Sequence, residues 1–390
     1  MRVTHVITRL IVGGAQENTV ASVLGLRARP GLEVDLISGP TTGPEGSIES
    51  QISGIPGCLV RVPDLIRPVR PFADFRAYRD LLTRFRQHRP DIVHTHSGKA
   101  GFLGRLAAWR AGVPWILHTI HGPSFGPFQG FVANRAFTAA EQMAGRVTDH
   151  FVVVAQAMAD QYLAAGIGRP EDYTRIFSGF HLDPFLSARR DPQLSARLGI
   201  QPGDFVLGKI ARLFELKGHD DLFAVAPELV RRIPQLKILL VGDGPWRARL
   251  EARAAEPDLR GHVIFSGLVP PDQVAGLVGQ MDVLVHLSRR EGLARALPQA
   301  LAAGKPVVAY DCDGAGEVCR QDQTGFLISP GDLGSLVQRL QQLSADENTR
   351  MRMGTVGREW VRERFSVESM VEQLHTLYSR LQTLPPRRRR

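Results

Sequence analysis

Residues 282–303 read DVLVHLSRREGLARALPQALAA, which is an apolar strand, a polar loop and a helical stretch in immediate succession. The same order recurs on both sides of this stretch, where short β-rich runs alternate with amphipathic segments. Such alternation is typical of a parallel sheet wrapped by helices. The sequence therefore predicts an α/β fold of the doubly wound, Rossmann-like kind. The predicted strands are 3–8, 33–38, 91–95, 115–119, 150–154, 174–178, 205–211, 236–241, 262–266, 282–286, 305–310 and 325–328.

The alternation of strands and helices becomes irregular around residues 184–202, where three prolines follow Asp183, Asp191 and Gln201. This composition indicates a connection between domains. We expect a first domain at 1–183, a second at 184–365, and a basic tail at 385–390. Two helical segments are predicted after Phe365 up to about residue 384, and this part (366–384) is expected to pack back on the first domain. Two doubly wound domains imply an interdomain cleft that both sheets face with their carboxyl ends.

Composition narrows the class of protein. Three cysteines without a CxxC pair argue against a disulfide scaffold or a structural zinc site, and no apolar run approaches the roughly 20 residues that span a bilayer. The N-terminus reads as a strand and lacks the apolar core of a signal peptide. We expect a cytoplasmic protein that is at most peripheral on the inner membrane surface.

The net charge of +9 is unevenly placed. Residues Arg61 to Arg89 hold eight arginines against three acids, and Arg387 to Arg390 close the chain. A basic surface of this kind favours an anionic membrane or a phosphate-bearing acceptor. The alternative is a solvated surface without a partner, and no nucleic-acid partner is predicted.

Three loops carry residues suited to a phosphorylated ligand. Gly13-Gly14 follow the first strand and open a helix, so the backbone can approach a phosphate closely there. Arg212 and Lys217 lie in the loop after the first strand of the second domain, where an Arg fork and a Lys charge can hold a diphosphate. A plain turn and two solvated cations are the alternatives.

The opening stretch adds the third loop. Glu291 lies in this loop, and the backbone N–H groups of Gly292, Leu293 and Ala294 can hold a phosphate at the helix start. Gln299 is expected about two turns further along. This spacing would let Glu291 touch a sugar while Gln299 contacts the nucleoside of one extended ligand.

Taken together, these motifs resemble the family 4 glycosyltransferases of the GT-B fold over nearly the whole chain. That resemblance implies two Rossmann-like domains and transfer of a sugar from a nucleoside-diphosphate donor to a hydroxyl acceptor, with retention of configuration. The residues that carry it are Gly13-Gly14, Asp91 to Gly101, His118 to Gly122, Arg212 with Lys217, Val241 to Pro245, the Glu291 loop, Asp313 to Glu317, Thr324 to Leu327, and Pro330 to Asp332.

The resemblance also implies roles for single residues. Glu291 is expected to contact the donor sugar and His121 to lie near that sugar from the first domain, although a packed histidine is the alternative because His118 is close in sequence. Lys99 is an acceptor-side candidate. Where the family has a second acid that holds ribose hydroxyls, this chain has Gln299, which can still accept a hydrogen bond but carries no charge.

No metal and no cofactor are predicted. His94 and His96 share one face of a strand, and with His118 and His121 they lack the carboxylate pattern of a metal centre. The acidic pair Asp311 and Asp313 is interpreted as a loop. Arg212 and Lys217 supply the positive charge that a metal would otherwise provide.

The predicted function is a hexosyl- or N-acetylhexosaminyltransferase of cell-surface polysaccharide or glycolipid synthesis, whose acceptor is an unidentified hydroxyl compound, lipid-linked if the membrane interpretation holds. Two alternatives remain open. A sugar-nucleotide epimerase shares this fold, but no acid/base pair for it is identifiable. A non-catalytic partner in a polysaccharide-assembly complex is favoured only by Gln299.

Overall fold

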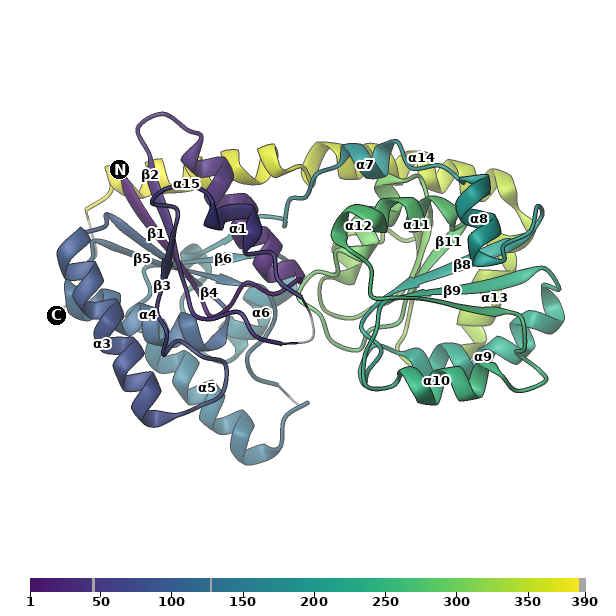
Figure 1. The fold of residues 1–390 in the computed structure, drawn as a ribbon, viewed down its shortest axis with the longest axis horizontal. Coiled ribbons are helices and arrows are strands. Elements are labelled where there is room, and N and C mark those ends of the chain that lie inside the picture. The colour runs from purple at the N-terminus through teal and green to yellow at the C-terminus, as the bar shows by residue number, and fades with distance from the viewer. Residues whose placement is uncertain (44–45, 127, 386–390) are drawn as a thin grey trace. The chain divides into compact units, whose positions relative to one another are not determined.

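The computed structural model describes residues 1–43, 46–126 and 128–385. The predicted basic residues Arg387 to Arg390 lie outside this part of the chain. Two compact units are present (Figure 1): residues 1–180 together with the chain from Val367 onward, and residues 181–366. The first unit thus ends three residues before the boundary at 183 that the sequence suggests.

The first unit contains a seven-stranded parallel sheet in the order β3-β2-β1-β4-β5-β6-β7. Its strands are β1 (Arg2–Ile7), β2 (Glu33–Ser38), β3 (Leu59–Arg61), β4 (Ile92–His96), β5 (Trp115–Ile120), β6 (His150–Val153) and β7 (Tyr173–Arg175). Its helices are α1 (Gly14–Arg27), α2 (Ser50–Ser53), α3 (Pro71–His88), α4 (Gly98–Ala111), α5 (Phe131–Gly145), α6 (Gln156–Ala164) and α15 (Val367–Thr383).

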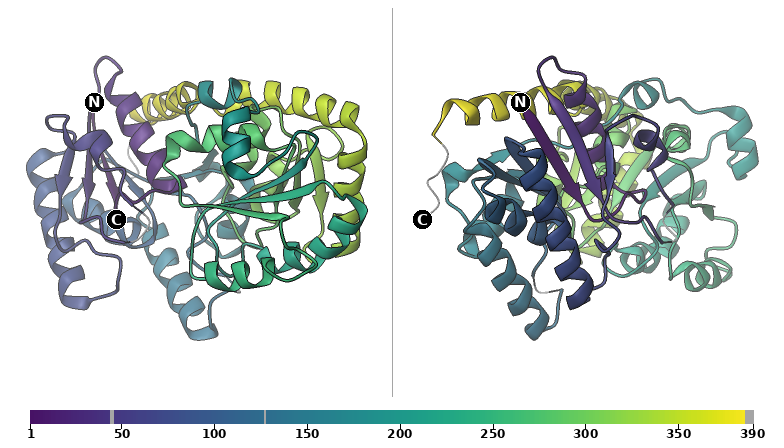
Figure 2. Two further views of the ribbon diagram at one scale, coloured as in Figure 1. Left: turned by 45° about the vertical axis from the view of Figure 1, so that its right-hand side comes forward. Right: turned by 60° about the vertical axis from the view of Figure 1, so that its left-hand side comes forward.

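Helices cover both faces of this sheet. Side chains of α1 and α15 form one apolar cluster with β1, β2, β4 and β5, whereas α3 and α4 form a second cluster on the opposite face (Figures 1 and 2). Because both faces are buried, the strands are near-continuous apolar runs, as the sequence pattern indicates.

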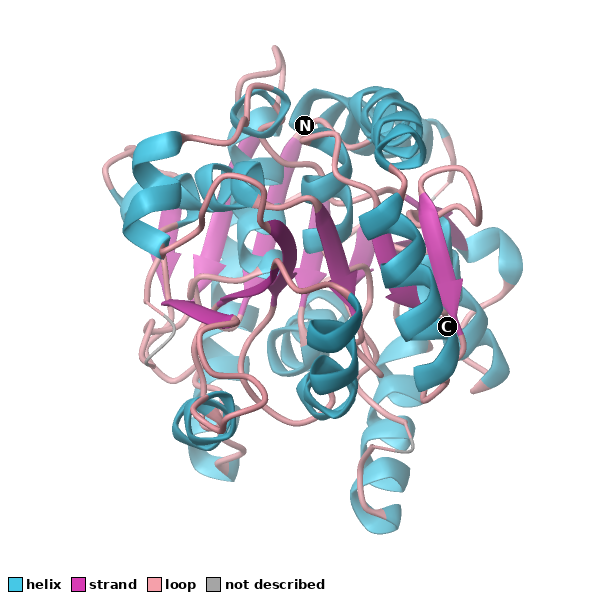
Figure 3. Ribbon diagram, turned by 90° about the vertical axis from the view of Figure 1, so that its right-hand side faces the viewer, coloured by secondary structure: helices cyan, strands magenta, loops and turns pink. Residues whose placement is uncertain are grey.

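The second unit contains a six-stranded parallel sheet in the order β10-β9-β8-β11-β12-β13, also flanked by helices (Figure 3). Its strands are β8 (Phe205–Ile210), β9 (Leu236–Val241), β10 (Val263–Gly267), β11 (Val283–His286), β12 (Val307–Tyr310) and β13 (Gly325–Ile328). Its helices are α7 (Asp183–Leu186), α8 (Pro192–Leu198), α9 (His219–Arg232), α10 (Arg247–Ala254), α11 (Val274–Gln280), α12 (Ala296–Ala302), α13 (Leu333–Ala345) and α14 (Glu347–Arg364).

Each sheet has one point at which the strand order reverses. The chain first builds outward from β1 and then returns to pair β4 with β1, and it does the same with β8 and β11. Loops at the carboxyl ends of the strands on either side of such a reversal diverge and leave room for a ligand. The doubly wound α/β prediction is therefore confirmed for both units.

Some local predictions are wrong. Two helical segments were expected after Phe365, but α14 ends before it and one helix, α15, follows it within the described chain. Gly354 and Gly357 weaken the helical signal of α14. Packing explains why glycine is present: a Cβ at Gly354 would lie 2.0 Å from the Gly304 carbonyl oxygen in the turn that follows α12.

Further short elements lie where none was predicted, among them β3, α7 and α8. Strand β3 escapes prediction because it has three residues and pairs at the sheet edge. The proline-containing connection at 184–202 includes α7 and α8, each with its proline in the first helical turn, where a missing N–H costs little.

Candidate functional site

Two loops of the second unit leave the carboxyl ends of β8 and β11, the strands on either side of the reversal. Residues 211–218 follow β8 and residues 287–295 follow β11. The Arg289 amide donates a 2.8 Å hydrogen bond to the Leu216 carbonyl and ties the loops together. Gly218 has φ +67°, and a Cβ there would lie 2.0 Å from a carbonyl oxygen of the second loop. Glycine at 218 therefore permits the close approach of the two loops.

This approach brings Lys217 and Glu291 into an ion pair between Nζ and Oε1, with both side chains mostly buried. The Ser288 hydroxyl contacts the same carboxylate oxygen at 3.2 Å. The Glu291 amide donates a 2.7 Å hydrogen bond to the Asp313 carboxylate, which enters from the end of β12. Glu291 is thus held by three neighbouring groups, and roles for Ser288 and Asp313 were not foreseen from the sequence.

Arg212 lies in the same loop as Lys217, and its side chain is exposed. The Arg212 Cζ is 5.4 Å and the Lys217 Nζ 5.9 Å from the centre of the Phe214 ring. Both cations therefore lie on one aromatic side chain, at distances within the range of cation–π attraction. The two predicted diphosphate-binding groups are brought together beside Glu291.

The helix of the opening stretch lies where the sequence predicts it, over residues 295–303, to within one residue at each end. Helix α12 runs from Ala296 to Ala302, so residues 292–294 precede it and Gln299 lies in its first turn. Within the described residues, no hydrogen bond uses the amides of 292–294 or the side chain of Gln299. These groups therefore keep their hydrogen-bonding capacity unused by the described protein.

Lys209 is a buried lysine on β8 beneath these loops, and it was missed in the sequence. Its side chain is 1% exposed, and its Nζ has no hydrogen-bond partner in the described chain. Burial and, to a smaller extent, the charge of Lys217 lower the pKa of Lys209 to about 7, although Asp221 and Glu291 act to raise it. The available signal was a lysine at an inward-facing position of an otherwise apolar strand.

In the first unit, Gly13 caps α1 and Gly14 is its first residue. Gly13 has an extended backbone that any residue can adopt, so its conformation does not require glycine. Lys99, the acceptor-side candidate, is paired with other groups of the first unit. Its ammonium donates to the Asp74 carboxylate at 2.5 Å and to the Pro68 carbonyl, and so it ties α4 to the start of α3.

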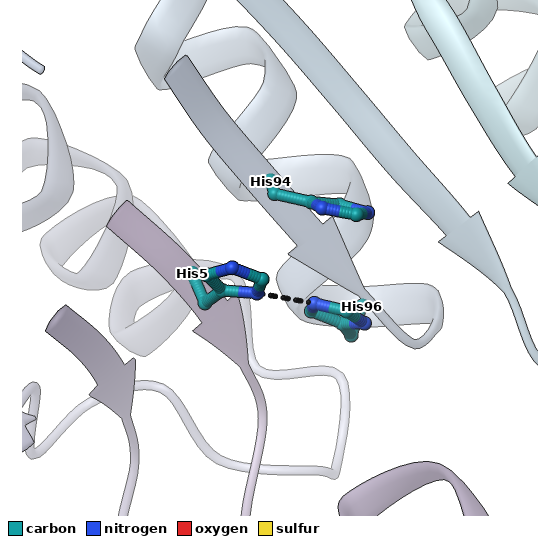
Figure 4. A group of neighbouring side chains, drawn as sticks. All are labelled: His5, His94 and His96. Carbon is teal, nitrogen blue, oxygen red and sulfur yellow. Dashed lines mark hydrogen bonds between the residues drawn. The ribbon is translucent and has the colours of Figure 1, made fainter. Parts of the chain in front are cut away.

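Histidines from three adjacent strands meet on the α1/α15 face of the first sheet. Parallel register places His5 of β1 directly beside His94 of β4, and His96 follows two residues later on the same face (Figure 4). The His5 Nδ1 lies 2.9 Å from the His96 Nε2. The His96 Nδ1 in turn lies 3.0 Å from the Nε2 of His121, just past the end of β5.

The environments of His118 and His121 differ. His118 is buried on the opposite face, where its Nδ1 lies 2.9 Å from the Thr95 hydroxyl and its ring packs under Gly101. His121 is half-buried, and its Nδ1 has no partner among the described residues. This placement suits a packed role for His118 and a ligand-facing role for His121.

His5, His94 and His96 each offer a ring nitrogen within 4.8 Å of the others, which raises the question of a metal. Two nitrogens on one tetrahedral zinc, each 2.0–2.1 Å from it, stand about 3.3 Å apart. The 2.9 Å between His5 and His96 is shorter and matches a hydrogen bond between the two rings. The arrangement described here is therefore that of a hydrogen-bonded network.

Comparison with known proteins identifies the class of protein to which this chain belongs. Residues 13–177 match the glycosyl transferase 4-like domain, and residues 191–360 match the family described as glycosyl transferases group 1. EpsD of Bacillus subtilis (strain 168), named as a glycosyltransferase, is 29% identical over 326 residues, which cover 80% of this chain and 83% of EpsD.

A second relative and a solved structure are similar to this chain over most of its length. The UDP-Gal:alpha-D-GlcNAc-diphosphoundecaprenol alpha-1,3-galactosyltransferase of Escherichia coli is 25% identical over 81% of this chain and 82% of its own length. The crystal structure of HepE from Anabaena in complex with UDP-glucose superposes with a TM-score of 0.81 at 21% identity, over 97% of this chain and all of HepE. The chain therefore belongs to the family 4 type of glycosyltransferases that pair these two domains, and its fold is GT-B.

The described residues contain no helix that is both long enough and apolar enough to cross a bilayer.

Lys209 generates a prediction about stability. A lysine in the unfolded chain titrates near pH 10.4, so between about pH 7 and 10 the unfolded state holds a proton that the folded state has lost. The stability of the second unit should therefore rise with pH across this window. Lys209→Met should raise the unfolding temperature at pH 7 and make it less dependent on pH.

Thermal unfolding at pH 7, 8 and 9 measures this difference. Lys237→Met is the matched control, because Lys237 lies on the neighbouring strand β9 but donates to the Gly261 carbonyl. If Lys209→Met and Lys237→Met shift the unfolding temperature equally at each pH, Lys209 is not buried as an uncharged amine.

Proposed function

We propose that this chain is a retaining glycosyltransferase that moves a sugar from a nucleoside-diphosphate donor to the hydroxyl of an acceptor. The observation that carries the proposal is the Lys217–Glu291 ion pair, which shares the β8–β11 reversal with Arg212 and with the unused amides of 292–294. Cations and amides suit a diphosphate, and a carboxylate suits sugar hydroxyls.

The same residues suggest how the reaction is assisted. Lys217 and Arg212 would stabilise the departing diphosphate, and the 292–294 amides would add oriented N–H dipoles. When Lys217 turns to a phosphate oxygen, Glu291 becomes available to a donor sugar hydroxyl while Ser288 and Asp313 keep it in place. Two cations supply the charge that a divalent metal provides elsewhere, and we therefore propose metal-independent catalysis.

The names of similar proteins support the class of substrates. The Escherichia coli relative is named for a UDP-sugar donor and a diphosphoundecaprenol-linked acceptor, and HepE was solved with UDP-glucose. A nucleotide-hexose or nucleotide-N-acetylhexosamine donor and a lipid-linked acceptor fit a role in cell-surface polysaccharide or glycolipid synthesis.

A donor screen followed by product analysis tests this function. A nucleotide sugar present at about 100 times its dissociation constant should stabilise the protein by roughly 2.7 kcal/mol, so thermal shift over UDP-, GDP- and ADP-sugars identifies the donor. Products are then analysed with and without acceptor. Conversion of the donor sugar to an isomer without acceptor would indicate an epimerase, and donor binding without turnover a non-catalytic partner. Activity that is lost in EDTA and restored by Mn²⁺ would refute metal independence.

Substitutions of Glu291 and of Gln299 should change different kinetic constants. Glu291→Gln keeps the shape of the side chain but loses the charge that pairs with Lys217, so kcat should fall strongly while donor KM changes less. Gln299→Ala removes one neutral hydrogen bond to the nucleoside and should raise donor KM roughly two- to twelve-fold.

Gln299→Glu is the matched control. It restores an acid that accepts hydroxyl hydrogen bonds more strongly, so donor binding should be kept or tightened. Steady-state kinetics over donor concentration gives all three values. Loss of activity in Gln299→Glu together with a silent Glu291→Gln would reverse the proposed roles.

We also propose that the first unit attaches to an anionic membrane through the start of α3. Val69, Phe72 and Phe75 are 74%, 85% and 59% exposed there. Of the eight arginines between 61 and 89, Arg61, Arg76 and Arg84 pair with acids; the others, which make no ion pair in the described chain, are Arg67, Arg70, Arg79, Arg86 and Arg89. Apolar side chains beside unpaired cations suit a lipid surface.

Vesicle co-sedimentation tests the attachment. Replacing both phenylalanines, Phe72→Ser with Phe75→Ser, should reduce binding to phosphatidylglycerol vesicles at low salt. The matched control is Leu268→Ser with Met351→Ser, which removes two exposed apolar side chains from the second unit. Deletion of residues 387–390 measures the contribution of the tail separately. Equal sedimentation of the wild type and the phenylalanine variant would exclude this surface.

A further inference from the structure

The histidines of the first unit belong to a longer network of hydrogen bonds that also includes Thr119 and Tyr378 and ends at Thr119 and His121. The Tyr378 hydroxyl, on α15, lies 2.5 Å from the His94 Nδ1 and 3.4 Å from the His5 Nε2. The His94 Nε2 lies 2.6 Å from the Thr119 hydroxyl. Each inner ring therefore uses both of its nitrogens. In order, the hydrogen-bonded groups of this network are Thr119, His94, Tyr378, His5, His96 and His121.

Burial keeps these rings neutral. It lowers the pKa of His5 to about 3 and that of His121 to about 4, and with neighbouring histidines it holds the pKa values of His94 and His96 well below the usual range. A neutral imidazole has one N–H donor and one bare nitrogen acceptor. When the direction of one bond in the chain is fixed, the directions of all the others follow.

The two distances at Tyr378 support one direction, in which the single Tyr378 proton lies in the shorter contact and the His94 Nε2–H donates to the Thr119 hydroxyl at 2.6 Å. An O–H donor makes shorter hydrogen bonds than an N–H donor. The 2.5 Å contact is therefore assigned to the Tyr378 O–H donating to His94, and the 3.4 Å contact to the His5 Nε2–H donating to the Tyr378 oxygen.

The donor and the acceptor in each remaining hydrogen bond of the network follow from this assignment. The His5 Nδ1 is a bare acceptor that receives the His96 Nε2–H, and the His96 Nδ1 receives the Nε2–H of His121. The proton of His121 is thereby placed on Nε2. Its Nδ1, which has no partner among the described residues, is left with a lone pair.

We propose that Tyr378, through His5 and His96, holds His121 in the tautomer that presents its bare Nδ1 as a hydrogen-bond acceptor toward the ligand. An acceptor at this position selects a sugar hydroxyl over a carbonyl or phosphate oxygen, because only the hydroxyl can donate. Tyr378 is thus a positioning residue that acts on His121 without touching substrate. Its effect on sugar transfer rests on the proposed function; the tautomer itself does not.

Nitrogen-15 NMR of histidine-labelled protein tests the tautomer directly, since protonated and bare ring nitrogens resonate far apart. The His121 signals are identified by their loss in His121→Gln. The wild-type protein should show a protonated Nε2 and a bare Nδ1 at His121, and Tyr378→Phe should give a mixture of both tautomers. A proton on Nδ1 in the wild type overturns the proposal without any variant. Stoichiometric zinc held by His5, His94 and His96 in the purified protein would overturn it too.

Tyr173→Phe is the matched control, because it also removes one tyrosine hydroxyl bond from this unit, the 2.7 Å bond to the Ile167 carbonyl. It should leave the His121 signals unchanged. An unchanged His121 tautomer in Tyr378→Phe would show that the chain of bonds does not set it.

Kinetics supplies the second readout. Tyr378→Phe should lower kcat for sugar transfer roughly two- to twelve-fold, as expected for one lost hydrogen bond, while the Kd for the free nucleoside diphosphate stays unchanged. A wild-type kcat in a variant with mixed tautomers would refute the positioning role. If the wild-type protein transfers no sugar at all, the proposed function fails while the NMR result still decides the tautomer.

Discussion

The parallel register of the strands is the constraint on which both candidate regions depend. In the first unit it sets His5 beside His94 and His96 beside Thr119, so side chains separated by about ninety residues share one face. In the second unit it brings the loops after β8 and β11 to one edge, where Lys217 meets Glu291. Because strand side chains alternate with a period of two, a shift of one residue in β4 would turn both of its histidines toward α3 and α4.

The histidine network of the first unit and the buried side chains near the Arg212–Lys217 loop of the second satisfy their polar atoms in opposite ways. In the first, each inner ring nitrogen has a partner, so neutral histidines are buried at little cost. In the second, the Lys209 Nζ and the His219 Nδ1 have none in the described chain, which is costly in an apolar interior. Both residues lie close to the loop that carries Arg212 and Lys217, so the less satisfied of these two regions is the one expected to receive an anionic ligand.

The sequence pattern predicted those features that depend on residues close to one another in the chain. The alternation of strands and helices and the placement of Arg212, Lys217 and Glu291 in strand-end loops all follow from short stretches. The contributions of Tyr378 and Asp313 could not be predicted in this way, because they arrive from remote segments: Tyr378 reaches His94 across 284 positions. Asp313 accepts from the Glu291 amide across 22 positions, from the loop that follows β12.

The C-terminal helix makes the first unit depend on the end of the chain. Met370, Val371, Leu374, Leu377 and Leu381 of α15 complete the cluster on α1, and glycine at position 25 leaves room for Val371, which a Cβ would meet at 2.4 Å. This face of the first sheet is therefore covered only in part, by α1, until residues 367–383 have been made. Tyr378 belongs to the same helix, so the packing that completes the core also supplies the hydroxyl between His94 and His5. The tautomer inferred for His121 is for that reason a property of the fully folded unit and not of its strands alone.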